Sequence, residues 1–428
     1  MRTRFTGILP IIFALFLLPG RTGRSVRCSS VHVKVSSPTI LCTLLGEKAS
    51  IGQNPGAVYI KRPTPDNDVA HWSSVQVHHP AEDTLSVMFW NVENFFDWRN
   101  DSTTVSDTEF SAKGERHWTW KRFQAKANAF AKALFWVEGE TGRLPDIVGL
   151  EEVENAFVLR PVLQKTALRK TDYKYIHYDS PDRRGIDVAL LYRSSQLELL
   201  ESKPCHLYAA DSVMATRDIL LCVFRRKHSD IPSVISGLTS SVIPGLTGNL
   251  SDSSTFTVLV NHHPSKYGGA SESEPRRRMA VERLRFLADS LSDAGIDRII
   301  AGGDFNDTPD NPVFRLLAPA LIPTHIDLHR RGQGTIKYDG KWDLIDHIYV
   351  SPGWINLQSA GSAPATDSLT TALSLSSVPS MRIIRIPFLL TRDTAHSGEK
   401  PLRTYTGPRY TGGVSDHLPV YLAVPLPP

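Results

Sequence analysis

Short runs of apolar residues, several of them alternating with polar ones, recur along most of the chain after residue 84. A period of two is typical of β-strands that are buried on one or both faces. We expect strands at residues 84–90, 146–152, 187–192, 219–224, 256–261, 298–302, 344–350 and 419–424. Apolar residues recur instead at helical spacing over residues 123–135 and 280–291, which predicts two amphipathic helices. Because strands outnumber helices and the helices fall between groups of strands, we predict an α/β fold in which helices flank a two-sheet β-sandwich.

The strand and helix pattern places one folded domain at residues 84–425. Two stretches rich in small and polar residues, 229–254 and 359–380, interrupt it. We interpret both as loop insertions and not as domain linkers, because patterned segments continue on each side. Residues 25–83 show weak periodicity and many Ser, Pro and His residues, so we predict a poorly ordered leader there.

The first 24 residues have the composition of an export signal. Arg2 and Arg4 precede an apolar run at residues 8–18, and a polar stretch follows. A basic start and a short apolar segment are typical of a secretory signal peptide, and the run is too short for a normal membrane span. Since no clean cleavage motif follows, an uncleaved anchor stays open. We therefore expect an exported protein that is periplasmic, secreted or anchored at its N-terminus.

Composition narrows the class of protein only slightly. The 428 residues are 41% hydrophobic and 21% charged, which is ordinary for a globular protein, and the net charge is +4. Mild basicity suits a polyanionic substrate, although a solvated surface gives the same balance. The four cysteines, Cys28, Cys42, Cys205 and Cys222, are not spaced as a zinc site. A disulfide between Cys205 and Cys222 and two buried free thiols both stay open, and no pattern points to a protein partner.

Polar side chains gather where the expected strands begin or end. They are Asn91, Glu93, Glu151, Glu152, Asn261, His262, His263, Asp304, Asn306, Asp346, His347, Asp416 and His417. Alternate residues of a strand face the same side, so Asp304 and Asn306 can reach one pocket, whereas adjacent Glu151 and Glu152 cannot both face inward. Carboxylate and amide oxygens suit Mg²⁺, Mn²⁺ or Ca²⁺. The pattern thus predicts metal-assisted hydrolysis, most simply of a phosphoester.

Six short motifs follow one another along the chain. They are Trp90–Asn94 (WNVEN), Pro145–Glu152 (PDIVGLEE), Asn261–Ser265 (NHHPS), Gly303–Asn306 (GDFN), Leu344–His347 (LIDH) and Ser415–Pro419 (SDHLP). Each motif alone is weak, but in this order they resemble the endonuclease/exonuclease/phosphatase superfamily, which includes deoxyribonuclease I, apurinic endonucleases, neutral sphingomyelinases and inositol polyphosphate phosphatases. The resemblance covers residues 84–425. It implies a four-layer, deoxyribonuclease I-like sandwich in an exported, bacterial-type member of the superfamily.

The resemblance also assigns roles to individual residues. It implies that the metal ligands are Asn91, Glu93, Glu152 and Asp416, and that the cation is Mg²⁺ (or Mn²⁺ or Ca²⁺). It implies that the catalytic residues are His262, Asp304, Asn306, Asp346 and His417. Within this set, Asp304 matches the residue that activates water, Asn306 the amide that contacts phosphate, and Asp346 the acid that orients His417. Apurinic endonucleases carry a different residue at the position of His262, which disfavours that branch.

Several neighbouring residues have an ordinary structural alternative. We expect Glu151 to be a solvated or supporting acid and not a ligand, and Glu93 has a structural role as its alternative. We expect the side chains of His263, His347 and Asp343 to be packing or surface residues. The basic, Tyr-containing loop at residues 403–413 either contacts substrate or is a mobile surface loop.

Three functions are compatible with this sequence. The first is a metal-dependent phosphodiesterase that acts as a nuclease, with nucleic acid as substrate. The second is a phospholipase- or sphingomyelinase-like phosphodiesterase that acts on membrane lipid. The third is a non-catalytic surface-binding protein that retains the fold, and the presence of His262, Asp304 and His417 argues against it. The deoxyribonuclease-like His262 and the mild basicity favour the nuclease.

Overall fold

The computed structural model describes residues 84–101, 104–227, 254–266, 269–355 and 378–426, and the backbone of five short strands before residue 77. The chain divides into two compact units, Met1–Glu82 and Asp83–Pro428. In the first unit, β1 (Ser25–Cys28) pairs with β2 (Val31–Lys34), and β3 (Lys48–Ile51), β4 (Ala57–Lys61) and β5 (Trp72–Gln76) form a second small sheet. The predicted signal at residues 1–24 lies outside the described residues, and the interpretation of residues 25–83 as a leader stays a prediction.

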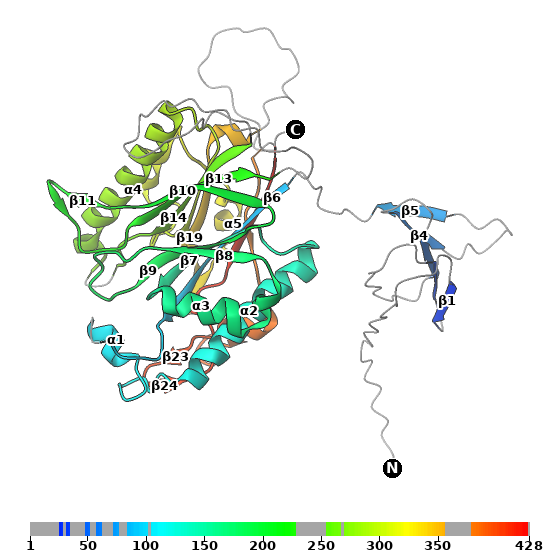
Figure 1. Ribbon diagram of the computed structural model, residues 1–428, viewed down its shortest axis with the longest axis horizontal. Helices are drawn as coiled ribbons and strands as arrows, with labels where there is room; N and C mark the ends of the chain where they lie inside the picture. The colour runs from blue at the N-terminus through cyan, green and yellow to red at the C-terminus, as the bar shows by residue number, and fades with distance from the viewer. Residues whose placement is uncertain are drawn as a thin grey trace, which may run out of the picture. The chain divides into compact units, whose positions relative to one another are not determined.

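The second unit contains two six-stranded sheets (Figure 1). The first sheet has the order β20 (Arg382–Ile383), β25 (Val420–Pro425), β6 (Thr84–Phe95), β7 (Ile147–Val153), β9 (Asp187–Arg193) and β8 (Tyr173–His177). The second has the order β10 (Leu197–Cys205), β13 (Ile219–Arg226), β14 (Thr255–His262), β15 (Ile299–Asp304), β19 (Asp346–Val350) and β16 (Ile322–Pro323). The expected strands are therefore present, most of them within a few residues of the predicted ends.

Alternation within single strands divides the core into layers. In β6, Val87 and Phe89 pack between the two sheets against residues such as Val260 of β14. Their neighbours Met88 and Trp90 face the other way, into a cluster formed with α2 (Trp120–Thr141) and α3 (Ala156–Lys165). A third cluster lies between the second sheet and α4 (Ala270–Asp293). The order of layers is helix, sheet, sheet, helix, and the predicted four-layer sandwich is confirmed.

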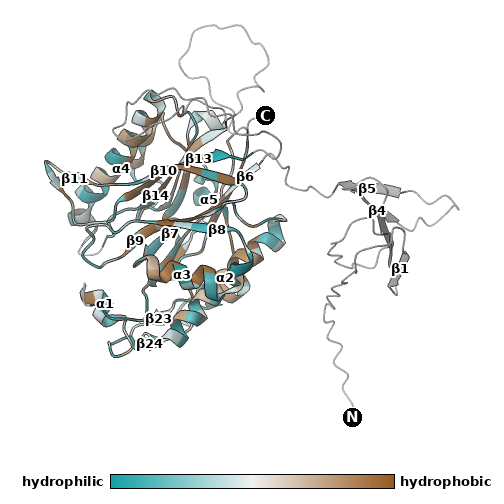
Figure 2. Ribbon diagram, viewed as in Figure 1, coloured by the Kyte–Doolittle hydropathy of each residue, from teal (hydrophilic) through white to brown (hydrophobic). Residues whose placement is uncertain are grey.

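Both amphipathic helices are longer than the sequence pattern predicts. The side-chain oxygen of Thr119 accepts a hydrogen bond from the Arg122 N–H and caps the start of α2, and Gly142, at φ 82°, ends it. The exposed ends of the helices carry few apolar residues, so periodicity alone could not locate them. Figure 2 shows the resulting pattern, with hydrophobic residues along the strands and polar ones on the outer faces of the helices.

The remaining elements are short. The helices are α1 (Val105–Glu109), α5 (Ile326–Arg330), η1 (Ala167–Lys170), η2 (Pro312–Leu317), η3 (Pro352–Trp354) and η6 (Pro387–Leu389). The strands are β11 (Tyr208–Ala209), β12 (Ser212–Val213), β17 (Ile336–Tyr338), β18 (Lys341–Asp343), β21 (Leu390–Arg392), β22 (Glu399–Pro401), β23 (Tyr405–Thr406) and β24 (Arg409–Tyr410). The predicted insertions, 229–254 and 359–380, lie almost wholly outside the described residues.

Two further properties bear on the expectations from sequence. Cys205 and Cys222 are buried free thiols on the paired strands β10 and β13, and burial raises the pKa of Cys205 to about 11. Of the two alternatives for these cysteines, the structure therefore has free thiols. Among the helices that the structure describes, none has the length and apolar character needed to cross a membrane.

Candidate active site

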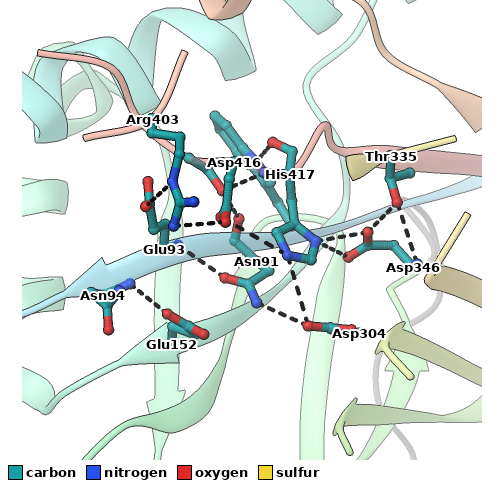
Figure 3. Close-up of polar contacts among 12 residues, drawn as sticks. Asn91, Glu93, Asn94, Glu152, Asp304, Thr335, Asp346, Arg403, Asp416 and His417 are labelled. Atoms are coloured by element: carbon teal, nitrogen blue, oxygen red, sulfur yellow. Dashed lines mark hydrogen bonds and ion pairs between the residues drawn. The ribbon is translucent and has the colours of Figure 1, made fainter. Parts of the chain in front are cut away.

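Strand pairing brings the polar strand ends of both sheets to one rim. In the first sheet, β6 and β7 run parallel, with Asn91 opposite Glu151. In the second sheet, β14 and β15 run parallel with His262 opposite Asp304, and Asp346 at the start of antiparallel β19 is also opposite Asp304. Sequence segments more than 200 residues apart therefore meet at one site, as Figure 3 shows for ten labelled residues.

The two parallel strands of the first sheet are both distorted at this rim. The β6–β7 ladder is interrupted between Asn91 and Phe95, and the β7–β9 ladder between Glu151 and Val153. Inside these interruptions, Glu93, Asn94 and Glu152 have φ values of 46°, 49° and 63°. Such left-handed conformations are costly for non-glycine residues and tend to gather at functional sites.

The distortion at Glu152 separates two adjacent carboxylates. Glu151 is fully buried between the sheets, whereas Glu152 turns toward the rim, where its Oε2 accepts a hydrogen bond from Asn94 N at 2.7 Å. Burial raises the pKa of Glu151 well above its usual range, and neither of its oxygens has a hydrogen-bond partner among the described residues. Of the two alternatives for Glu151, a solvated acid is excluded, and its burial beside Asp346 and Asp304 fits the supporting role. The β-bulge at Glu152 turns the two neighbouring carboxylates in different directions.

One carboxylate oxygen, Oδ2 of Asp304, lies at the centre of the site. The amide nitrogens of Asn91 and Asn306 donate to it at 3.1 and 3.2 Å. The Nε2 atoms of His262 and His417 lie 3.6 and 4.0 Å from the same oxygen. All four residues were expected at one site, and the two sheets bring them around a single atom.

His417 is fixed in place by a second carboxylate. Its Nδ1 lies 2.9 Å from Oδ2 of Asp346, and its backbone N–H donates to Ser415 Oγ at 2.9 Å. Thr335 Oγ1 donates to the same Asp346 oxygen, which holds the carboxylate in turn. A histidine held through Nδ1 presents Nε2 to the site with a defined tautomer.

The two histidines have opposite protonation preferences. Burial lowers the pKa of His262 well below its usual value, and nearby cations such as Arg217 and Arg184 lower it further. Burial also disfavours a charged His417, but the carboxylates of Asp346 and Asp304 outweigh it and hold the pKa of His417 well above the usual value. Burial raises the pKa of Asp304 itself to about 7. The site therefore pairs a neutral imidazole with a charged one.

Two of the four expected metal ligands contact one arginine, and a third acts on its charge. Arg403 donates to Glu93 through Nε at 2.8 Å and lies 3.0 Å from Asp416 through Nη2. The second oxygen of Glu93 accepts a hydrogen bond from Thr404 N at 2.9 Å. The pKa of Arg403 is raised by Asp416, Glu93 and Glu152 against the effect of burial, so all three carboxylates act on it. Glu93 is thus occupied by protein donors, which favours the structural alternative for it.

A buried lysine lies beneath the same carboxylates. Lys126 of α2 bonds through Nζ to the Glu93 carbonyl and to Thr404 Oγ1, the latter at 2.9 Å. Burial lowers the pKa of Lys126 to about 8, opposed by Glu93, Glu152 and Asp416. Burial and Asp416 raise the pKa of Glu93 to about 7. Because Asp416 raises the pKa of Glu93, these carboxylates repel one another, and a bound divalent cation would reduce the repulsion.

The donor set fits a hard cation. It combines the amide oxygen of Asn91 with the carboxylates of Glu152 and Asp416, which are the ligand types that Mg²⁺, Mn²⁺ and Ca²⁺ accept. In the described part of the chain, the one group of His and acidic side chains close enough to share an ion is elsewhere, at His177, Asp179 and Asp187.

The sequence did not reveal the basic and polar side chains that hold the predicted site residues in place. Arg403, Lys126 and Arg184 each contact a predicted site residue more than 30 positions away, and Thr335 contacts Asp346, which is 11 positions away. The loop at residues 403–413 contains Arg403 and the β23–β24 pair, and Arg403 reaches into the site from it. His263 and His347 pack against Phe305, as expected, with ring centroids 4.5 and 5.0 Å away.

Comparison with known proteins addresses the fold and the family. Comparison with curated proteins gives no match. Solved structures with a similar fold include the human nocturnin catalytic domain with bound sulfate (17% identity, TM-score 0.44, 81% of this chain and 95% of that chain). They also include D. rerio TDP2 with a single-strand DNA product (16%, 0.42, 80% and 99%) and a Bacteroides thetaiotaomicron mannosyl-6-phosphatase (16%, 0.42, 79% and 99%). A model of the Endonuclease/Exonuclease/phosphatase family matches residues 86–245 and 236–425. The chain therefore belongs to the endonuclease/exonuclease/phosphatase family, whose fold supports the hydrolysis of phosphoric esters.

Proposed function

We propose that this protein is a divalent-metal-dependent phosphodiesterase that hydrolyses nucleic acid. The observation that carries the proposal is the arrangement around Asp304 Oδ2, where two histidines of opposite protonation preference approach one carboxylate oxygen. In-line hydrolysis at phosphorus needs a group that orients water, a cation for the phosphoryl charge and a donor for the leaving oxygen. The site holds a candidate for each.

The roles follow from position and charge. Asp304, with a pKa near neutrality, orients the attacking water and accepts its proton. His417 is charged, so its Nε2–H offsets the charge that develops on the phosphoryl oxygens and gives its proton to the leaving oxygen as the P–O bond breaks. His262 remains neutral and hydrogen-bonds the substrate, while the Asn306 amide contacts the phosphate. Asn91, Glu152 and Asp416 would hold a cation such as Mg²⁺, which would polarise a phosphoryl oxygen.

The rim of the site favours nucleic acid over lipid. The side chain of Arg184 is 43% exposed and lies 3.5 Å from Glu152, and that of Arg403 is 51% exposed beside Asp416. The β17–β18 hairpin begins where Ile336 pairs with His417, and its tip carries Tyr338, which is 79% exposed, and Lys341. Arginines and an exposed aromatic ring suit a phosphate backbone with stacked bases. Within the described residues, no observation of this kind beside the site supports membrane lipid as substrate.

We also propose that the protein is exported. Support comes from the basic and apolar residues 1–24 alone, and the reduced state of Cys205 and Cys222 is compatible with any compartment. Expression in a bacterial host of the full chain, and of a chain that begins at residue 25, tests this. Full-length protein in the periplasm or medium and truncated protein in the cytosol are expected, and equal distribution of the two would refute export.

Purified full-length protein tests the activity. It is incubated with plasmid DNA and, separately, with sphingomyelin vesicles, each with Mg²⁺ and with EDTA. We expect nicking of the plasmid that requires Mg²⁺, and no release of lipid headgroup. His417→Ala should lower the rate by at least about 100-fold, because it removes the charged Nε2. His329→Ala is the matched control, since His329 is a partly exposed histidine on α5.

The outcomes separate the alternatives. Lipid turnover with intact DNA would move the proposal to the lipid branch of the family. Activity on neither substrate would exclude both and leave phosphomonoesters as the next class. Activity that survives in His417→Ala at the His329→Ala rate would refute the assignment of roles.

A further inference from the structure

A second group of potential metal ligands lies at the junction of two paired strands. His177 is the last residue of β8, Asp187 is the first residue of β9, and Asp179 lies in the loop between them. One ligand atom from each of these side chains lies within 4.8 Å of the other two. This group contains none of the residues assigned above to catalysis.

Hydrogen bonds among the three side chains do not account for this arrangement. His177 Nε2 lies 3.6 Å from Asp187 Oδ2, and His177 Nδ1 lies 3.8 Å from Asp179 Oδ1. Both distances are too long for hydrogen bonds. The two ring nitrogens point in different directions, so one ion would use only Nε2. The 3.6 Å from Nε2 to Asp187 Oδ2 approaches the separation of two ligand atoms around one tetrahedral ion, roughly 3.3 Å for bonds of about 2.0 Å.

The histidine is buried with a nitrogen left over. The side chain of His177 is 3% exposed, and its Nε2 has no hydrogen-bond partner among the described residues. A buried ring nitrogen without a partner is unfavourable, because burial removes its hydrogen bond to water and nothing in the protein replaces that bond. The atom points toward Asp187 Oδ2, where a cation would satisfy it.

Asp187 is oriented as a ligand would be. Its Oδ1 accepts hydrogen bonds from Ser180 N, at 3.0 Å, and from Ser180 Oγ, so that Oδ2 is directed to His177. Metal-binding carboxylates are commonly held by such secondary hydrogen bonds. Burial lowers the pKa of His177 and raises that of Asp187 to about 8. A neutral imidazole is the form that binds metal, and an ion would favour ionised Asp187.

We propose that His177, Asp179 and Asp187 form a second divalent-cation site, distinct from the one at Asn91, Glu152 and Asp416. One imidazole and two carboxylates suit an ion that accepts nitrogen as well as oxygen, of which Zn²⁺ is the representative. Mg²⁺, which prefers an all-oxygen octahedron, suits it less well.

Its position gives the site a structural role toward the active site. The loop at residues 178–186 is closed at both ends by the three ligands, and it carries Arg184. Arg184 Nη2 donates to Asn94 Oδ1 at 2.7 Å and lies 3.5 Å from Glu152. An ion across the base of the loop would fix the position from which Arg184 approaches the substrate.

Zinc binding to metal-free, full-length protein tests the proposal directly. Zn²⁺ is titrated in competition with a chromophoric chelator into wild type, Asp179→Asn, His177→Gln, Glu152→Gln and Asp211→Asn. The side chain of Asp179 is 88% exposed, so its substitution leaves the fold intact even if His177→Gln does not fold. Asp211 is an exposed aspartate outside the group and serves as matched control.

We expect wild type, Glu152→Gln and Asp211→Asn to share one Zn²⁺ site that Asp179→Asn weakens by at least about tenfold and His177→Gln removes. Zn²⁺ should raise the Tm of wild type and of Glu152→Gln, and this shift should shrink in Asp179→Asn. If wild type binds no Zn²⁺, or if Asp179→Asn binds it with wild-type affinity, the proposal is wrong. Loss of the site in Glu152→Gln would mean that the ion binds at the active site instead.

Discussion

The Nδ1 atom of His417 lies 2.9 Å from Oδ2 of Asp346, a residue 71 positions earlier in the chain. Asp346 opens β19 of the second sheet, and His417 precedes β25 of the first, so the pair joins the two sheets at the rim of the site. The carboxylate raises the pKa of His417 against the effect of burial. Asp346 therefore sets both the direction and the charge of the imidazole.

Replacing Asp346 by Asn should leave His417 in place but remove this charge. We expect kcat to fall about 10²- to 10⁴-fold, by analogy with the loss of an orienting aspartate in other histidine sites, with KM within roughly threefold. Steady-state hydrolysis of a chromogenic phosphodiester measures both constants. Asp343→Asn, three residues earlier and paired with Lys341, is the control and should keep wild-type rates. Equal rates for the two variants would remove Asp346 from the mechanism.

Gly303 illustrates a backbone requirement next to Asp304. Its φ is 130°, and a Cβ there would lie 2.0 Å from the Asn261 carbonyl oxygen and 2.8 Å from Glu151 Oε1. Gly303→Ala should therefore lower the free energy of unfolding by more than about 3 kcal/mol. Gly398 has φ 81° with nothing within 4 Å of a Cβ, so Gly398→Ala should cost only about 1 kcal/mol. Denaturant unfolding compares them, and similar losses would show that the contacts at Gly303 relax freely.

The fold was predictable from the sequence because the alternation of side chains along a single strand shows which residues face each layer of the core. In β6, Val87 and Phe89 face one core and Met88 and Trp90 the other, and the continuous apolar run predicts burial on both faces. Strands of two residues, such as β16 and β20, contain too few positions for a period to be detected. They exist because tertiary neighbours provide the hydrogen bonds.

The site was predictable only in part. The motifs supplied the residues that meet around Asp304 because each lies where an expected strand begins or ends, and parallel strands such as β14 and β15 end at one edge. The bulge that buries Glu151 could not be predicted, since it arises from φ 63° at Glu152, which has no local signature. The contact of Arg403 with Glu93 spans 310 residues and depends on how a loop returns to the site.

Lys126 is expected to hold the acidic cluster together. Its buried ammonium lies beneath Glu93, Glu152 and Asp416, and its removal leaves those carboxylates without a buried counter-charge. Lys126→Met should lower the free energy of unfolding by about 3–5 kcal/mol at pH 7. Lys121→Met, at an exposed position of the same helix, should change it by less than about 0.5 kcal/mol. Equal effects in thermal or denaturant unfolding would show that Lys126 is uncharged or dispensable.

His325 should make the protein sensitive to acid. Its ring is fully buried and stacked on His347 with centroids 4.3 Å apart, and burial lowers its pKa to about 3. The unfolded chain takes up a proton on this residue below about pH 6.5, whereas the native state does so only near pH 3. Stability is therefore lost as the pH falls through this window, by up to about 1.4 kcal/mol per pH unit.

His325→Phe keeps an aromatic ring at the stack and removes the titration. Loss of the hydrogen bond from His325 Nδ1 to the Ile348 carbonyl, 3.1 Å long, adds a penalty that does not vary with pH. We therefore expect the free energy of unfolding of the variant to rise relative to that of wild type as the pH is lowered from 7 to 4. Both proteins keep the part of the acid sensitivity that comes from His263. Unfolding free energies measured at each pH give the difference directly. A difference that stays constant with pH would mean that His325 is protonated in the native state, or that it becomes accessible to solvent before the protein unfolds.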